Sequence, residues 1–153
     1  MSVLAAVRPD SWNFPLLVHV FGAMVLVGGL VTAVSVLAFA KGDAKLLRFG
    51  YWSLLAIAFP GYLVMRLGAQ WIYSKEHWDD VPDKFVPSWL GIGFAIADLG
   101  GLLLVISLIL GGIGVRKLPS GRSVGLLKAT MGFSIVILAA ALVAVWAMAG
   151  KPN

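Results

Sequence analysis

The sequence contains no cysteine, and that absence excludes several kinds of chemistry. Without a thiol the chain can form no disulfide, hold no iron–sulfur cluster, bind no metal through thiolate and attach no haem covalently in the c-type manner. Any bound metal would need histidine, methionine or carboxylate ligands.

Charged residues are also scarce. They make up 12% of the 153 residues, whereas 60% are hydrophobic, and the mean hydropathy is +0.95. Soluble domains carry about 25% charged residues. The isoelectric point near 9.8 does not indicate a nucleic-acid partner, because most basic residues lie in two short connections between apolar runs. The composition therefore indicates an integral membrane protein whose main partner is the lipid bilayer.

Motifs for hydrolytic or nucleotide chemistry are missing as well. There is no P-loop, no zinc motif of the His-Glu-x-x-His form and no recognisable Ser/His/Asp set. The acidic stretch 76–83 offers oxygen ligands but lacks the alternating pattern and the glycine of a calcium loop. We expect a solvated turn there, with Trp78 at the membrane interface, and the sequence leaves open whether the protein is an enzyme.

Four apolar runs are present, at residues 14–40, 49–74, 88–115 and 126–149. Each has at least about 20 residues, enough for a helix to cross roughly 30 Å of hydrocarbon. The sequence thus predicts an all-α fold, a single four-helix transmembrane domain over residues 1–153. The first run is longer than the apolar region of a signal peptide, so we expect a retained helix.

The basic residues predict the topology. The connections after the first and third runs contain seven Lys and Arg, whereas the loop between the second and third runs contains two. The positive-inside rule then places both basic connections in the cytoplasm and both termini outside. Tryptophans near the proposed outer ends agree with this orientation. We expect a multi-pass protein of the plasma (inner) membrane.

Polar residues inside the predicted spans form the candidate site. Arg66 in the second span is costly in hydrocarbon because a guanidinium stays charged, and Asp98 in the third span is its best partner. Tyr62 and Gln70 lie four residues on either side of Arg66 and share its helix face. His19 lies at a similar outer depth in the first span. Two interpretations remain: a pocket lined by these residues, or a structural ion pair that fixes helix register.

Small residues predict where the helices approach closely. They recur at four-residue spacing in three spans, as Gly28 and Thr32, as Gly93, Ala97 and Gly101, and as Ala140 and Ala144. In the second span, Pro60-Gly61 predicts a kink about midway.

The segment from Leu17 to Gly29 has a histidine followed by the small pair Gly22-Ala23 and then Gly28-Gly29. In this it resembles the opening helix of small bacterial four-helix membrane proteins that are loosely similar to the copper-resistance CopD and HemJ-type proteins. Weaker similarity continues at Pro60-Gly61 and from Trp89 onwards. The resemblance implies that His19 is a haem ligand. This sequence differs in having no second histidine within a span and in carrying Asp98.

These observations support three hypotheses. In the first, the protein binds a small ligand in an outer-half pocket between helices. Haem b is the most specific candidate and a quinone-like molecule is another. The contact residues would be His19, Tyr62, Arg66, Gln70 and Asp98, with His19 as the metal ligand. In the second, the protein is an accessory or scaffold subunit of a larger membrane complex, or a homo-oligomer. In the third, it takes part in proton-coupled transport.

Overall fold

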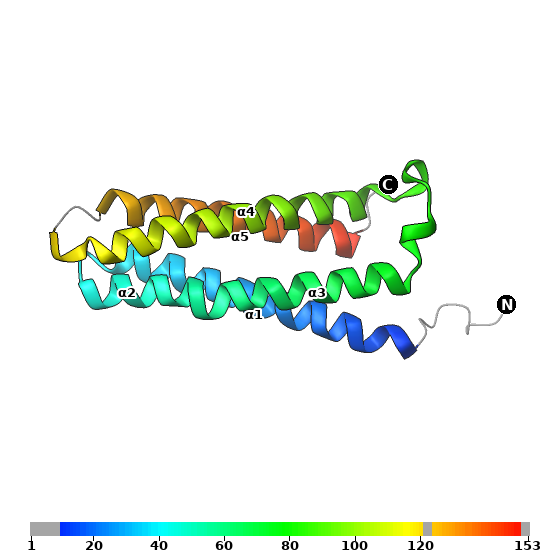
Figure 1. Ribbon diagram of the computed structural model, residues 1–153, viewed down its shortest axis with the longest axis horizontal. Helices are drawn as coiled ribbons and strands as arrows, with labels where there is room; N and C mark the ends of the chain where they lie inside the picture. Colours follow the sequence, from blue (N-terminus) through cyan, green and yellow to red (C-terminus); the bar gives the residue numbers. More distant parts are fainter. Residues whose placement is uncertain (1–9, 121–123, 151–153) are drawn as a thin grey trace.

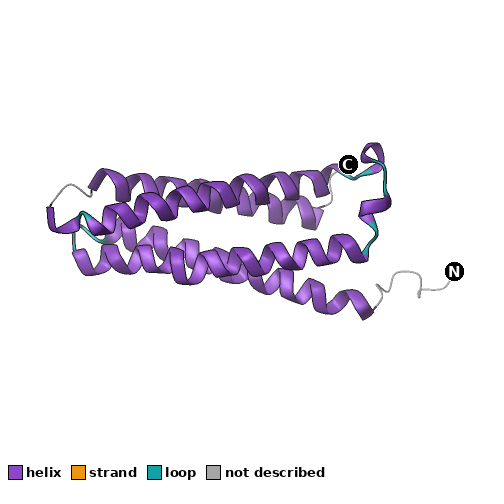
Figure 2. Cartoon of the chain, in the orientation of Figure 1, coloured by secondary structure: helices purple, strands orange, loops and turns teal. Residues whose placement is uncertain are grey.

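The chain folds into long helices joined by short connections (Figure 1). The structure is a computed structural model that describes residues 10–120 and 124–150. Its main elements are α1 (Asn13–Phe39), α2 (Ala44–Ser53), the π-helical turn η3 (Leu54–Ala58), α3 (Phe59–Lys75), α4 (Ser88–Arg116) and α5 (Val124–Gly150). The remaining helical elements are short 3-10 turns: η2 (Asp10–Trp12), η4 (Trp78–Asp80), η5 (Asp83–Phe85) and η6 (Leu118–Ser120). Within them Figure 2 shows helices and loops and no strand.

Four helices are long and apolar enough to cross a membrane, namely 13–39, 44–75, 88–116 and 125–150. The second is formed by α2, η3 and α3, which continue into one another. The protein is therefore a small polytopic membrane protein, and the predicted all-α bundle of four long apolar helices is confirmed. Three points stay predictions: the side of the membrane on which the termini lie, the identity of the membrane, and the treatment of residues 1–153 as one domain.

The second membrane helix begins at Ala44, earlier than the apolar run that predicted it, because a polar cap starts it. The Asp43 carboxylate accepts hydrogen bonds from the backbone N–H groups of Lys45, at 2.7 Å, and Leu46, at 3.3 Å. The chain reverses direction just before this cap, where Lys41 has a φ of 44° and Gly42 a φ of 90°. This turn holds α2 against the end of α1.

The predicted irregularity in the second span lies just before Pro60. At η3 the helix widens, and the Phe59 N–H donates to the carbonyl of Leu54, five residues back. Proline has no N–H and its ring crowds the carbonyl one turn earlier, so a π-helical turn here lets the helix continue through it. Gly61 has a separate role at the contact with α1.

Four glycines bring the backbone of α1 into direct contact with those of η3 and α3. A Cβ added at Gly68 would lie 2.5 Å from the backbone nitrogen of His19, and one at Gly61 would lie 2.5 Å from that of Leu26. On α1, a Cβ at Gly29 would lie 2.6 Å from the nitrogen of Ala58, and one at Gly22 would overlap the backbone of Met65. No side chain larger than hydrogen fits at these crossings.

The predicted contact through Gly28 and Thr32 is wrong. A Cβ at Gly28 would meet nothing within 4 Å, and the Thr32 hydroxyl donates to the Gly28 carbonyl of its own helix at 2.8 Å. The glycines that do make contact repeat every seven residues on each helix, a spacing that stays on one face over two turns. Gly93 and Gly101 face side chains, those of Met148 and Tyr62, and not a neighbouring backbone.

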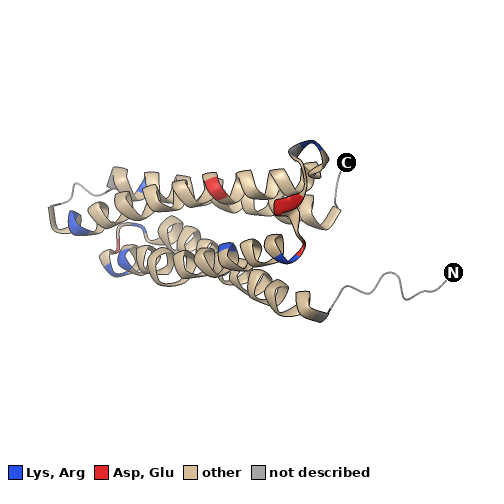
Figure 3. Cartoon of the chain, turned by 45° about the vertical axis from the view of Figure 1, so that its right-hand side comes forward, with Lys and Arg blue, Asp and Glu red and all other residues tan. Residues whose placement is uncertain are grey.

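The bundle consists of two helix pairs, α1 with α3 and α4 with α5 (Figures 1 and 2). Buried apolar side chains join the pairs near the middle of the molecule; they are Leu26, Leu30, Ala33, Leu54, Ala58, Leu104 and Ile137. Charged residues lie mostly at the two ends of the bundle (Figure 3). Arg66 and Asp98 instead lie within the membrane helices 44–75 and 88–116. Toward the end that carries the α3–α4 loop, the two pairs leave a cavity.

Candidate functional site

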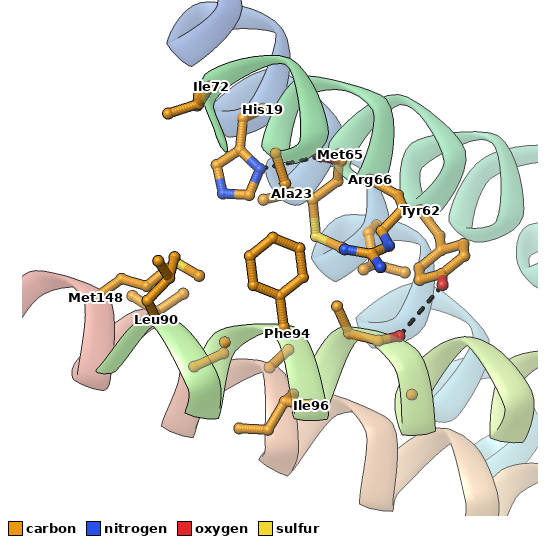
Figure 4. Close-up of a pocket in the computed structure, with 18 of the residues that line it drawn as sticks. His19, Ala23, Tyr62, Met65, Arg66, Ile72, Leu90, Phe94, Ile96 and Met148 are labelled. Carbon is orange, nitrogen blue, oxygen red and sulfur yellow. Dashed lines mark hydrogen bonds between the residues drawn. The ribbon is translucent and has the colours of Figure 1, made fainter. Parts of the chain in front are cut away.

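A cavity of about 380 Å³ lies between the two helix pairs and is lined by residues of α1, α3, α4 and α5 (Figure 4). Its walls are mostly apolar, with Leu16, Ala23, Leu90, Ile137 and Val145 among the lining residues. Three of the polar side chains in the wall belong to site residues predicted from the sequence: His19, Tyr62 and Arg66. Three predicted site residues from two helices therefore line one cavity.

Arg66 lies in the wall formed by α3. Its Nη2 donates to the Oδ1 of Asp98 at 2.7 Å, which confirms the contact expected between the second and third spans. The guanidinium carbon lies 4.9 Å from the centre of the Phe94 ring, close enough for a cation–π interaction. The other terminal nitrogen, Nη1, is buried and has no hydrogen-bond partner among the described residues. The arginine thus has an unpaired donor group in the wall of the cavity, covered by neighbouring atoms in this structure.

His19 lies in the wall formed by α1, and the glycine contact described above fixes its place. Its Nδ1 lies 3.0 Å from the carbonyl oxygen of Met65 on α3. A carbonyl can only accept, so Nδ1 carries the proton, and in the tautomer with a single proton Nε2 has the free lone pair. A hydrogen bond from one ring nitrogen to a carbonyl is also the usual support for a histidine that binds metal through the other.

Aromatic side chains connect α3 to α4 around the cavity. The Tyr62 hydroxyl donates to the Ala97 carbonyl at 3.2 Å, and the rings of Tyr73 and Phe94 meet edge to face with centres 5.2 Å apart. Together with the Arg66–Asp98 pair, these contacts connect α3 to α4 through side chains. They leave open space between the helices where a ligand could lie.

The loop after α3 covers one end of the cavity. Glu76 and Trp78 both line it, and the Trp78 indole N–H donates to a Glu76 carboxylate oxygen at 2.6 Å. Trp78 is half-buried, and its predicted position at the membrane interface stays a prediction. The Tyr73 hydroxyl donates to the Trp78 carbonyl at 3.4 Å, so the loop is attached to α3.

Two of the predicted site residues lie apart from the cavity wall. Gln70 is one turn beyond Arg66, but its side chain is exposed and does not line the cavity. Asp98 contacts Arg66 yet points outward, with 61% of its side chain exposed, and it does not line the cavity either. The structure therefore brings together His19, Tyr62 and Arg66, with Asp98 as the outer partner of the arginine.

The residues 10–120 and 124–150 contain no group of three or more His, Asp or Glu side chains placed to hold a metal ion. His77, the other histidine, lies in the loop with 80% of its side chain exposed and 3.7 Å from an oxygen of Asp80. A metal or haem iron in the cavity would thus have His19 as its histidine ligand. The thioethers of Met65 and Met148 also line the cavity.

Sequence reasoning missed Phe94 and the residues that close the cavity. Phe94 lies one helical turn before Asp98 on the same face of α4. Its contact with the guanidinium could therefore have been predicted from the Arg66–Asp98 pair. Trp89 and Leu90, near the start of α4, had no comparable signal, because an apolar residue in a membrane helix is as compatible with lipid as with a cavity.

The comparisons with known proteins add no relative. No family model, no curated protein and no solved structure matches this chain. The likeness of the first span to CopD and HemJ-type proteins is therefore supported only by the residues that suggested it.

Proposed function

We propose that this membrane protein binds a small, largely apolar ligand with an anionic or carbonyl end in the cavity between its two helix pairs. The observation that carries the proposal is Nη1 of Arg66, a buried charged donor without an acceptor in a mostly apolar wall. A buried unpaired donor costs free energy, and a ligand oxygen that accepts from it after rotation of the arginine side chain would recover it. The volume of about 380 Å³ is within the range of roughly 300–1,000 Å³ found for small-molecule pockets.

Haem b is the most specific candidate. The free Nε2 of His19 would bind the iron, and Arg66 would pair with a propionate. Met65 and Met148 also line the cavity, and the thioether of either would be available as a further ligand to the iron. The likeness of the first span to HemJ-type proteins points to the same histidine. A quinone is the other candidate, with a carbonyl oxygen accepting from Arg66.

The test is a titration of the detergent-purified protein with haem b and, separately, with a short-chain quinone. For haem we expect a shifted Soret band that His19→Ala abolishes and that His77→Ala, the matched exposed histidine, leaves intact. For the quinone we expect quenching of tryptophan fluorescence, because Trp78 and Trp89 line the cavity. Arg66→Gln should weaken either ligand roughly tenfold or more, the effect of losing a charged hydrogen bond.

The outcomes separate the candidates. No Soret shift in the wild-type protein removes haem and leaves the quinone. Binding of neither ligand, or binding that survives both His19→Ala and Arg66→Gln, would overturn the proposal.

A second function is favoured by a different observation. Asp98 lies ten residues into α4, about 15 Å from the start of that helix, yet its side chain is 61% exposed. A carboxylate facing lipid at that depth is costly, so a partner subunit or second copy covering it is favoured. Gly91 and Ala95 are exposed on the same face of α4 and would let a helix approach closely.

This alternative predicts that Ala95→Trp reduces the size of the native assembly in mild detergent without lowering thermal stability. Gly93 and Gly101 are unsuitable for the purpose, because larger residues there would collide with Met148 and Tyr62 of the same chain. An assembly of unchanged size in Ala95→Trp, or a wild-type protein that is monomeric in native membranes, would remove the subunit hypothesis.

A further inference from the structure

A second hollow lies at the opposite end of the bundle, where the α1–α2 turn meets the start of α5. It is a groove of about 310 Å³, bordered by Lys41 and Lys128 and with apolar walls that include Leu37, Leu47, Leu127 and Met131. None of these residues contributes to the cavity described above. We refer to this hollow as the lysine groove.

The two lysines come from different parts of the chain and have exposed side chains. Within residues 10–120 and 124–150, no carboxylate lies within ion-pair distance of either ammonium group. Asp43, the acidic residue nearest to Lys41 in the chain, has an oxygen that accepts from the N-terminal N–H groups of α2. The groove therefore presents two cations without an internal counterion.

The backbone fixes where Lys41 sits. Its left-handed conformation, with a φ of 44°, belongs to the tight turn in which the Asp43 N–H donates to the Ala40 carbonyl at 2.7 Å. A lysine seldom adopts this conformation, because its Cβ then crowds the backbone. The turn holds the lysine at the rim, directly beyond the last residues of α1.

The walls of the groove are apolar and belong to membrane helices. Leu127 is 3% exposed and Leu37 is 9% exposed, and Leu47 and Met131 are half-buried. α1 ends at Phe39, so the lysines lie where a membrane helix leaves the hydrocarbon and the walls extend into it. A ligand that fits both parts has an anionic head and an apolar chain.

We propose that the lysine groove binds an anionic phospholipid, with its phosphate between Lys41 and Lys128 and an acyl chain against Leu37, Leu127 and Met131. Basic pockets between membrane helices are where anionic headgroups bind. Further basic residues lie at the same end, Lys45 and Arg48 in α2 and Arg116 and Lys117 at the end of α4, and they raise the local concentration of such lipids. The inference requires only that the protein lies in a membrane, and it does not depend on which ligand the other cavity binds.

The experiment is native mass spectrometry of the detergent-purified protein titrated with phosphatidylglycerol or with phosphatidylcholine of the same chain length. We expect the wild type to retain phosphatidylglycerol preferentially. Lys41→Gln combined with Lys128→Gln should weaken that binding roughly 100-fold, from about a tenfold loss for each charged contact with the phosphate.

The matched control is Lys45→Gln combined with Lys117→Gln, which removes the same charge from the same end but outside the groove. We expect a much smaller loss in this variant. Equal losses of lipid affinity in the two double variants would show that the overall positive charge of this end attracts the lipid. That result would overturn the proposed site in the lysine groove.

Inorganic phosphate separates a lipid site from a small-anion site. Millimolar phosphate should not displace the bound lipid, because it cannot use the apolar walls. Displacement by phosphate alone, or equal retention of the two lipids by the wild type, would contradict the proposal. His19→Ala should leave lipid binding unchanged, so failure of the proposed cavity ligand would be seen separately.

Discussion

The two neighbours of α3 are held to it in opposite ways. Against α1 the backbones touch, through glycines on both helices, and a Cβ at Gly61 or Gly68 would lie 2.5 Å from the facing chain. Against α4 the contact is made by side chains, namely the Arg66–Asp98 pair, the Tyr62 hydrogen bond and the edge-to-face Tyr73 and Phe94 rings. Where the backbones meet no space is left, whereas a layer of large side chains leaves the cavity.

The difference suggests a division of roles. The α1–α3 contact is rigid, because the two backbones meet directly and only the movement of a whole helix can change it. This contact fixes the position of His19 relative to Met65. The α3–α4 contact can change by rotation of single side chains, so entry of a ligand need not disturb the backbone. The predictions below test this contrast at each contact.

The largest effect is expected from Gly68→Ala. The new methyl would lie 2.5 Å from the His19 nitrogen, so α1 must move away, and we expect a loss of about 3 kcal/mol in unfolding free energy. The His19 contact with Met65 should be lost with it. Reversible unfolding of the purified protein in mixed micelles would measure the loss.

Gly28→Ala is the matched control on α1. A Cβ there meets nothing within 4 Å, so the substitution should change stability by less than about 1 kcal/mol, in the direction of stabilisation. Equal losses in the two variants would show that the helices do not touch where the structure places them.

The sequence predicted the four membrane helices well, because a helix that crosses a membrane must be long and apolar whichever helix it packs against. Apolar length located all four spans, and the cost of an intramembrane guanidinium was enough to predict the contact of Arg66 with Asp98. The glycine contacts were missed, because this glycine-rich chain offers several small-residue spacings and only the three-dimensional fit distinguishes Gly29 from Gly28.

The candidate site was predictable only in its polar part. His19, Tyr62 and Arg66 stood out as polar groups in apolar helices, and all three line the cavity. Gln70 had the right periodicity and still points outward, since a predicted helix face is broad and the cavity touches only part of it. The existence of the cavity depends on how far α4 stands from α3, which no local pattern encodes.

An intermediate effect is expected at the charge pair. Asp98→Leu leaves the guanidinium without its partner, and we expect a loss of about 2 kcal/mol. Arg66→Leu combined with Asp98→Leu removes both charges and should be less destabilised than Asp98→Leu alone. Unfolding in micelles would measure both variants. If the double variant lost the sum of the two single losses, the residues would not act as a pair.

The smallest effect is expected at Tyr62, the neutral contact between α3 and α4. Tyr62→Phe removes the hydrogen bond to the Ala97 carbonyl but keeps the ring, so we expect a loss of about 1 kcal/mol. Tyr73→Phe on the same helix is the control. Its hydroxyl makes a longer bond, 3.4 Å, to the Trp78 carbonyl in the loop, so the loss should be smaller.

Ligand binding makes the Tyr62 comparison sharper. If side chains hold α3 to α4, Tyr62→Phe should also loosen the cavity wall, and a saturating ligand should recover part of the lost stability by binding only the folded state. Tyr73→Phe should show no such recovery beyond that of the wild type. Identical behaviour of the two variants, with and without ligand, would mean that the Tyr62 hydroxyl does not hold the helices together and that the apolar core joins the two pairs by itself.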